Sequence, residues 1–376
     1  MERDIFIIGS GQTPFGEWWD KGIRELADDA IEKALENAPC SAIDIDMVIV
    51  ANMLAEHVSG QAHLGSMIAS LLPHQPPAIR AEAACASGAV AMHTACSMLE
   101  SGRARNILVV GVEKMTDADN STITSALMGA ADNDKDAPSG ITFPGLFGLI
   151  ASRYMHEYGL TREQLSCVSS LHHAQAMDNP NAQFRSPAMP DQVSASPLVA
   201  DPLRLLDCSP ISDGAAACIL STEHKSPLRL AASQITTDTT SITGRTNLTS
   251  FAATREAMEH ALTEAAIERS DISTVELHDC FSIAAVISLE DLGFAEPGRG
   301  IELYQHPDPA FGINRSGGLK ACGHPVGATG IKQVVEIGKQ LLQSKKQWGL
   351  AQNFGGIGAT CCIHIIENLS STHSHV

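Results

Sequence analysis

The chain has 376 residues, with a hydrophobic content of 44% and an aromatic content of only 4%. This length suffices for two core-forming units, and the scarcity of aromatic residues predicts cores of small and branched aliphatic side chains. The formal net charge of −18 at pH 7 disfavours nucleic acids and anionic membrane surfaces as partners, because both repel an acidic protein. An anionic substrate would need local positive groups.

Cysteine usage indicates the compartment. Ten cysteines occur without paired spacing, no C-x-x-C pattern is present, and no secretory leader precedes the apolar run at residues 5–8. These features predict free thiols in a reducing compartment, with the cytoplasm as the expected location. No apolar stretch reaches the roughly 18 residues needed to span a bilayer, so no membrane association is expected.

Short apolar runs alternate with helical patterns through the first half of the chain. Strands are predicted at residues 4–9, 47–51, 106–111 and 215–220, and helices at residues 23–37 and 60–72. From about residue 115 to 205 the pattern breaks into polar residues and short helical pieces. A structureless insertion of that length is improbable inside a compact domain, so we interpret it as a lid-like subdomain with functional loops. Residues 1–225 form the predicted first half.

Residues 226–376 repeat this plan. Strands are predicted at residues 228–233, 274–278, 348–352 and 360–366, and helices at residues 251–267, 281–292 and 327–342. Two similar α/β halves whose loops converge predict a pseudo-twofold protein with its site between the halves.

Cys85 is the first candidate for chemistry. It lies in the run Ala83-Ala84-Cys85-Ala86-Ser87-Gly88-Ala89, where the pattern predicts a buried helix of small residues from Cys85 to about Glu100. The positive end of a helix dipole favours a thiolate, which is the nucleophilic form of cysteine. A cysteine chosen at random is more often a small hydrophobe in the core. The surrounding motif favours the nucleophile.

Three further loops carry polar residues where predicted strands end and helices begin. They are the run His278-Asp279-Cys280-Phe281, the glycine-rich residues 317–330 with His324, and the run Asn353-Phe354-Gly355-Gly356-Ile357-Gly358. A nucleophilic thiol needs a base, a second acid or base for the other reactant, and N–H donors for an oxyanion. The four loops together contain all three. No ligand set with the usual tetrahedral spacing accompanies Cys322 and His324, so no metal is expected.

The order of these motifs resembles the thiolase family over essentially the whole chain. The motifs are C-x-S-G at Cys85, H-D-C-F at His278, G-G-x-x-x-x-G-H-P-x-G-A-T-G at residues 317–330, and the glycine-rich loop near the C-terminus. Residues 207–220 also look like the thiolase segment that closes the first half. The resemblance implies a five-layered αβαβα fold of two doubly wound halves with a lid loop domain, and at least a dimer.

Two departures from the more common thiolases place the chain near the sterol-carrier-protein and archaeal acetoacetyl-CoA types. Those common enzymes have asparagine where His278 stands and a second catalytic cysteine where Asn353 stands. A cysteine occurs instead in the H-D-C-F run. Because Asn353 has no proton to exchange at neutral pH, Cys280 is the expected replacement acid and base.

The resemblance implies ping-pong acyl transfer between CoA thioesters by an acyl-CoA C-acyltransferase. His324 would take the proton of Cys85, and the backbone N–H groups of Cys85 and Gly355 would stabilise the oxyanion. In condensation, Cys280 would remove a proton from acetyl-CoA while His278 and His324 stabilise the enolate with a water. The reverse reaction would cleave a 3-ketoacyl-CoA. No cofactor is expected, because the CoA thioesters are substrates.

Contacts with CoA and with other chains are harder to read from the sequence. Gly317 and Gly318 would let the backbone approach a ligand closely, and Lys320 could meet a CoA phosphate. The expected assembly is a homodimer or a dimer of dimers. A zinc-ribbon/OB-fold protein is a further candidate partner, because some archaeal relatives work with one.

Two alternatives stay open at this point. One cysteine with two histidines is also the set that decarboxylative ketoacyl synthases use, and those enzymes need no second cysteine. The chain could also be a non-catalytic, thiolase-shaped subunit of a larger complex. Cys280 favours the thiolase reaction over the decarboxylative one.

Overall fold

The structure, a computed structural model, describes residues 4–374. Five strands of the first half lie side by side in the order β3-β2-β4-β7-β1. They are β1 (Ile5–Gln12), β2 (Met47–Ala51), β3 (Ala78–Ala81), β4 (Asn106–Glu113) and β7 (Gly214–Ser221). β2 runs parallel to β3 and β4, and β7 runs antiparallel to β4 and β1. Every residue of β4 and β7 is buried, as expected for strands covered on both faces.

The second half repeats this arrangement strand for strand. Its order is β10-β9-β11-β12-β8. The strands are β8 (Leu228–Thr237), β9 (Ile272–Glu276), β10 (Gly312–Ile313), β11 (Trp348–Gly355) and β12 (Thr360–Asn368). β9 runs parallel to β10 and β11, and β12 runs antiparallel to β11 and β8. The predicted pseudo-twofold plan of two α/β halves is therefore confirmed.

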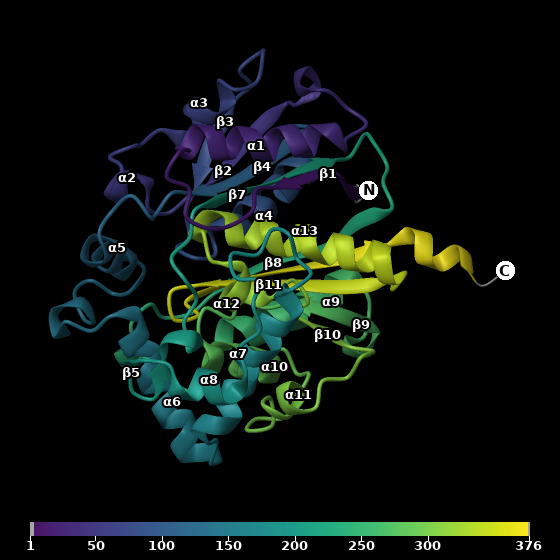
Figure 1. Ribbon diagram of the computed structural model, residues 1–376. Coiled ribbons are helices and arrows are strands. Elements are labelled where there is room, and N and C mark those ends of the chain that lie inside the picture. Colours follow the sequence, from purple (N-terminus) through teal and green to yellow (C-terminus); the bar gives the residue numbers. More distant parts are fainter. Residues whose placement is uncertain (1–3, 375–376) are drawn as a thin grey trace.

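The layers alternate between helices and sheet. α1 (Ile23–Glu36) covers the outer face of the first half-sheet, α4 (Ser87–Glu100) and α13 (Val326–Ser344) lie between the half-sheets, and α9 (Ala252–Ala265) and α10 (Ser282–Asp291) cover the far face (Figure 1). β1 and β8 pair through Ile5 with Leu230 and Phe6 with Arg229, which joins the half-sheets into one ten-stranded sheet. This is the expected five-layered αβαβα fold.

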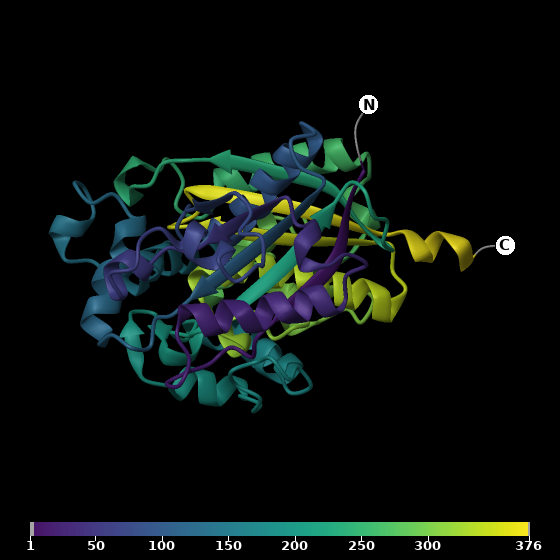
Figure 2. The same cartoon turned by 90° about the horizontal axis from the view of Figure 1, so that it is seen from above.

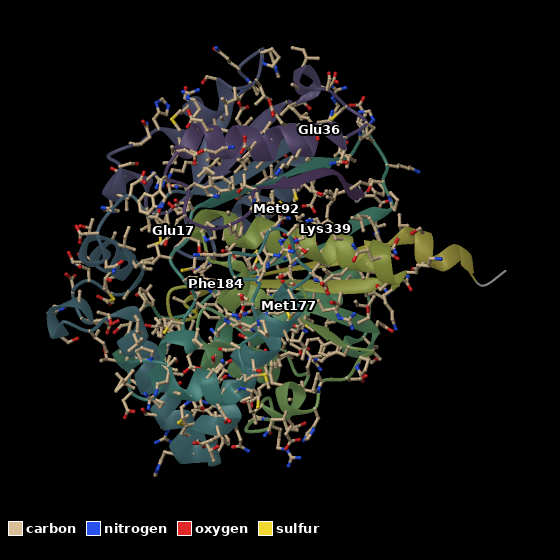
Figure 3. The ribbon with its side chains drawn as sticks, viewed as in Figure 1. Glu17, Glu36, Met92, Met177, Phe184 and Lys339 are labelled. Atoms are coloured by element: carbon tan, nitrogen blue, oxygen red, sulfur yellow. The ribbon has the colours of Figure 1, made fainter. Side chains whose placement is uncertain are left out.

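Small residues let the two central helices touch. A Cβ placed on Gly88 of α4 would lie 2.9 Å from the backbone nitrogen of Gly330. A Cβ placed on Gly330 of α13 would lie 2.3 Å from the backbone nitrogen of Ala89. Met92 lies buried in the core that α4 and α13 share between the half-sheets (Figure 3). The crossing of these helices brings their N-terminal ends, and the loops before them, to one place.

The segment between β4 and β7 is a helical insertion, as the sequence predicts. Its helices are α5 (Asn120–Leu127), α6 (Phe143–Tyr158), α7 (Arg162–Ala176) and α8 (Pro190–Ala195), followed by a hairpin of β5 (Leu198–Ala200) and β6 (Leu203–Arg204). α5 lies at the end of the molecule opposite the C-terminus (Figure 1 and Figure 2). The Phe147 ring of α6 stacks on Phe281 at 4.6 Å between centroids, so the insertion packs beside the H-D-C-F loop. Met177 and Phe184 stay exposed (Figure 3).

Residues 4–374 contain no helix that is both long enough and apolar enough to cross a membrane.

Candidate active site

Cys85 lies in a turn between β3 and α4 rather than in the helix itself. α4 begins at Ser87, two residues later than predicted. The Ser87 hydroxyl accepts the Ala83 N–H at 2.9 Å and donates to the Ala84 carbonyl at 2.6 Å. Ala84 has a φ of +51°, a left-handed conformation that costs energy for a residue other than glycine. These bonds hold the chain as a tight turn, which is why the predicted helix start at Cys85 was wrong.

The Cys85 thiol is protonated at neutral pH, contrary to the thiolate that we expected. Burial raises its pKa to about 12, and a backbone hydrogen bond from Gly356 only partly opposes this rise. The loss of solvation outweighs the helix dipole, because the helix starts beyond Cys85 and the neighbouring Glu113 raises the pKa further. A nucleophilic Cys85 therefore needs a base in contact with it.

His324 has the arrangement of such a base. Its Nδ1 lies 2.6 Å from the Thr329 hydroxyl, and that hydroxyl lies 3.0 Å from the Pro325 carbonyl, to which it donates. The hydroxyl oxygen thus accepts the Nδ1 proton, which leaves the lone pair on Nε2. Burial lowers the pKa of His324 to about 4. The imidazole is neutral at pH 7 and can accept a proton.

His278 has the opposite tautomer. The Asn353 side-chain nitrogen lies 2.8 Å from its Nδ1 and donates to it, so the Nε2 atom carries the proton. The Gln352 side chain accepts the backbone N–H of His278 at 2.9 Å, and the Phe354 ring lies 4.4 Å from the imidazole. Burial, and then the neighbouring His324, lower the pKa of His278 well below its usual value. His278 is a neutral hydrogen-bond donor.

The two imidazoles and the thiol form one cluster. The Cys85 sulfur and a ring nitrogen from each of His278 and His324 lie within 4.8 Å of one another. Both Nε2 atoms are buried and have no hydrogen-bond partner among the described residues. The rings meet edge to face with their centroids 4.9 Å apart. A thiol here faces one acceptor and one donor, which suits proton removal from sulfur and stabilisation of a developing oxyanion.

Cys280 is the second thiol of the site. It is 7% exposed, and its carbonyl accepts the Ser209 N–H at 2.9 Å. Burial and then the nearby Cys85 raise its pKa well above the usual value, whereas the Lys320 ammonium lowers it. Cys280 is thus a proton donor at rest. A positive charge beside it would stabilise the thiolate that forms when it gives up that proton.

Lys320, expected at a CoA phosphate, lies in the interior. It is 2% exposed and donates from Nζ to the Asp279 carbonyl at 2.6 Å. Gly318 is equally enclosed, because a Cβ there would lie 2.5 Å from the Asp279 carboxylate, and Gly317 packs in the same way on Ala176. Lys320 and Gly318 thus contact Asp279 of the H-D-C-F loop, whereas Gly317 packs on α7. No contact with CoA follows from these positions.

Several contributors to the site could not be found from sequence patterns. Thr329 sets the tautomer of His324, Asn353 sets that of His278, and Gly356 directs its backbone N–H to the Cys85 sulfur. Gly355 packs against the nucleophile turn, since a Cβ on it would lie 2.4 Å from the Ala83 carbonyl. Residues 329 and 353–356 do fall in the predicted loops. Thr329 and Asn353 have their partners within the second half, and Gly356 reaches across to the first.

Comparison with known proteins identifies the family. Residues 5–224 match the thiolase N-terminal domain, and residues 235–368 match the thiolase C-terminal domain-like family. The chain belongs to the thiolase family.

Among its relatives, this thiolase is 42% identical to the acetyl-CoA acetyltransferase of Methanothermobacter thermautotrophicus, in an alignment that covers 97% of this chain and 100% of the relative. It is 30% identical to human sterol carrier protein 2 over 90% of this chain and 66% of that protein.

Solved structures show the same fold for the thiolase chain. The acetyl-CoA acetyltransferase from Syntrophomonas wolfei superposes with a TM-score of 0.78 at 19% identity, covering 98% of this chain and 100% of that one. A chain of the Ltp2-ChsH2(DUF35) aldolase superposes with a TM-score of 0.81 at 19% identity, covering 97% of this chain and 98% of that one.

Proposed function

We propose that this thiolase is an acyl-CoA C-acyltransferase that transfers acyl groups through the sulfur of Cys85. The observation that carries the proposal is the pair of neutral imidazoles of opposite tautomer, one an acceptor and one a donor, whose nitrogens lie within 4.8 Å of that sulfur. The relative with 42% identity, an acetyl-CoA acetyltransferase, supports acetyl-CoA as a substrate.

In the first step, His324 Nε2 takes the Cys85 proton as the sulfur attacks the thioester carbonyl. The oxyanion would be stabilised by the backbone N–H groups of Cys85 and Gly355. The C–S bond to CoA then breaks, and the departing CoA sulfur takes the proton of Cys280. The products are an acyl thioester on Cys85, an imidazolium at His324 and a thiolate at Cys280. The raised pKa of Cys280 keeps its thiol protonated at rest and makes the thiolate that forms in this step a strong base for the next one.

In the second step, the Cys280 thiolate removes a proton from the methyl group of acetyl-CoA. The enolate oxygen accepts hydrogen bonds from Nε2–H of His278 and from the His324 imidazolium. Its carbon attacks the acyl thioester, and the Cys85 sulfur leaves and regains its proton from His324. Every side chain thus returns to its starting protonation state. The reverse sequence cleaves a 3-ketoacyl-CoA, and neither direction consumes a cofactor.

The assembly that we propose is a homodimer formed along β3. This strand is the outer strand of its half-sheet, and Ile79 in it is 38% exposed. An unpaired, apolar edge strand is a template for pairing with another chain. A DUF35 protein, of the kind named in the Ltp2-ChsH2(DUF35) aldolase, is a candidate additional partner.

The decisive experiment compares acyl donors. We expect purified protein to form acetoacetyl-CoA from acetyl-CoA alone, and mass spectrometry to detect an acetyl group on Cys85. Condensation only with malonyl-CoA would identify a decarboxylative enzyme. A chain that forms neither product nor acetyl-enzyme would be a non-catalytic subunit.

Cys280→Ser separates the two steps. We expect acetylation of Cys85 to persist in this variant, because solvent can protonate the departing CoA sulfur. Condensation should fall by at least 100-fold, because a serine hydroxyl is a far weaker acid than a thiol and cannot form the base that removes the methyl proton. Cys322→Ser, another buried cysteine, is the matched control and should retain condensation. Equal rates of condensation in Cys280→Ser and the unmodified protein would exclude Cys280 as the acid and base.

A further inference from the structure

The cluster at Cys85 has the composition of a zinc site. Cysteine sulfur and histidine nitrogen are the ligands that Zn²⁺ prefers, and three protein ligands with an open fourth position are typical of accessible zinc sites. Cys85, His278 and His324 supply one sulfur and two nitrogens within 4.8 Å of one another. The Nε2 atoms of both histidines are buried without a hydrogen-bond partner within residues 4–374. Proton transfer accounts for these residues, but their capacity to bind a metal goes beyond the acyl-transfer reaction.

We propose that Cys85, His278 and His324 bind one Zn²⁺ reversibly, and that the bound ion blocks acylation. The block rests on the proposed function, because it follows from Cys85 being the acyl-carrying nucleophile. In binding, the Cys85 S–H bond breaks, the proton passes to solvent and a Zn–S bond forms. No electron transfer is involved. The fourth position of the ion would lie where the thioester carbonyl binds, so zinc and acyl-CoA exclude each other.

The required movement is small. With Zn–S and Zn–N bonds of about 2.3 and 2.0 Å, ligand atoms around a tetrahedral ion lie about 3.3 to 3.5 Å apart. The three atoms here must each approach a common centre by about 1 Å or less. Rotation about the Cα–Cβ bond of Cys85 moves its sulfur without moving the backbone of the turn.

The partners of the imidazoles decide how readily each one binds the ion. His324 is ready, because Thr329 holds its Nδ1 proton and the Nε2 lone pair is free. His278 must exchange tautomers, because Asn353 now donates to Nδ1. Rotating the Asn353 amide by 180° brings its oxygen, which has no partner among the described residues, to an Nδ1–H and frees Nε2. A carboxylate at this position would hold the metal-binding tautomer permanently.

Cobalt provides a readout independent of turnover. Protein freed of metal with a chelator is titrated with Co²⁺, whose thiolate charge-transfer absorption reports a Co–S bond, and then with Zn²⁺ to displace it. We expect one equivalent of each ion, loss of acetyl transfer to Cys85 as zinc binds, and recovery on adding EDTA. Acetyl transfer is measured by mass spectrometry with acetyl-CoA and no added CoA, so that the free CoA available to bind zinc is only that which the reaction itself releases.

Variants assign the ligands. Cys85→Ala and Cys85→Ser should abolish the charge-transfer band, and Asn353→Asp should tighten zinc binding by about 10-fold or more. Cys362→Ala is the matched control, because the Cys362 sulfur lies 3.7 Å from Nε2 of His364 in another buried pair of cysteine and histidine. Loss of Cys362 should leave the charge-transfer band unchanged.

The proposal is overturned if the unmodified protein shows no charge-transfer band, or if Cys85→Ala binds the ion with unchanged stoichiometry and affinity. Failure of the acyltransferase function gives a different result, namely a cobalt–thiolate band at Cys85 in a protein that never becomes acetylated.

Discussion

At the scale of single residues, chemistry at this site depends on which atom holds each proton. Cys85 keeps its proton because burial raises its pKa, and His324 stays neutral because burial lowers its pKa. Thr329 and Asn353 then assign opposite tautomers to two imidazoles that lie edge to face. A cysteine and two histidines therefore become a proton donor, a proton acceptor and a hydrogen-bond donor, without a charge at rest.

The pKa of His324 predicts how Cys85 reacts at low pH. Because that pKa is lowered to about 4, the neutral base persists at pH values where an ordinary histidine is already protonated. The rate at which iodoacetamide alkylates Cys85 should therefore fall as the pH is lowered, with an acid limb centred near pH 4. Mass spectrometry measures this rate while circular dichroism monitors folding. His324→Gln should react more slowly and lose this limb. A limb centred near pH 6.5 would contradict the assignment.

Lys320→Met tests the charge beside Cys280. Removing the buried ammonium withdraws its stabilisation of the Cys280 thiolate. We expect condensation to fall by about 10-fold, equivalent to about 1.4 kcal/mol, and its pH optimum to move to higher pH. Acetylation of Cys85, in which solvent can also protonate the departing CoA sulfur, should change by less than about twofold.

Lys332→Met removes an equally buried lysine that pairs instead with Glu276 at 3.2 Å, so it controls for loss of stability. A parallel fall of both half-reactions in Lys320→Met would show that Lys320 is merely structural.

At the scale of elements, the site is held where the ends of several segments meet. The buried Glu113 carboxylate, at the end of β4, accepts backbone N–H groups from Met53 and Leu54 after β2 and from Gly327 in the first turn of α13, each at 3.0 Å. It thereby fixes the start of the helix that follows His324. The contact between Gly88 and Gly330 fixes the same helix against α4.

Gly330→Ala tests that helix contact. The new methyl group would meet the Ala89 nitrogen at 2.3 Å and the Asn353 side-chain oxygen at 2.5 Å, neither of which can move without displacing the site. We expect a loss of about 1 to 3 kcal/mol in the free energy of unfolding, measured by urea denaturation, together with reduced acetylation of Cys85.

The control for this variant is Gly338→Ala on the same helix. A methyl group there meets only the flexible Leu228 side chain, at 2.8 Å. The gain in helix propensity, at most about 1 kcal/mol, offsets this contact, so stability should change by less than that amount. Equal stability of the two variants would show that α4 and α13 pack less tightly than described.

At the scale of the whole molecule, two equivalent halves leave two unequal sheet edges. The outer strand of the second half, β10, has only two residues, whereas its counterpart β3 has four and exposes Ile79. A short edge strand resists pairing, and a longer apolar one invites it. This difference is why we place the dimer contact along β3.

Ile79→Lys should weaken that dimer. A lysine in the middle of an edge strand blocks pairing with a second copy, because its charge would be buried in the new sheet. We expect light scattering with size-exclusion chromatography to give the mass of a dimer for the unmodified protein and a shift toward monomer for the variant. Ile43→Lys, at a site 58% exposed and outside the strands, should leave the mass unchanged. A dimer unaffected by Ile79→Lys would place the interface elsewhere.

Much of the fold could be predicted because its signals are local. Apolar runs of five or six residues indicated β2, β4 and β7, and the alternation of strands and helices predicted two similar halves. The start of α4 could not be predicted, because the Ser87 side chain and the left-handed Ala84 form a turn that has no periodic signal. The motif order was equally informative for the site, since it marked the three loops that hold Cys85, His278, Cys280 and His324, and the fourth loop that holds Asn353.

Motif order and periodicity lie within the chain, so the family, the strand and helix plan, and the side chains capable of chemistry could all be read from the amino-acid sequence. The states of those side chains could not. The protonation of Cys85, the tautomers of His278 and His324, and the interior position of Lys320 depend on burial and on the partner that each side chain meets. That partner is far away in sequence for His278, which meets Asn353, and five residues away for His324, which meets Thr329. Desolvation and hydrogen bonding act through space, so they arise only once the chain has folded around these side chains.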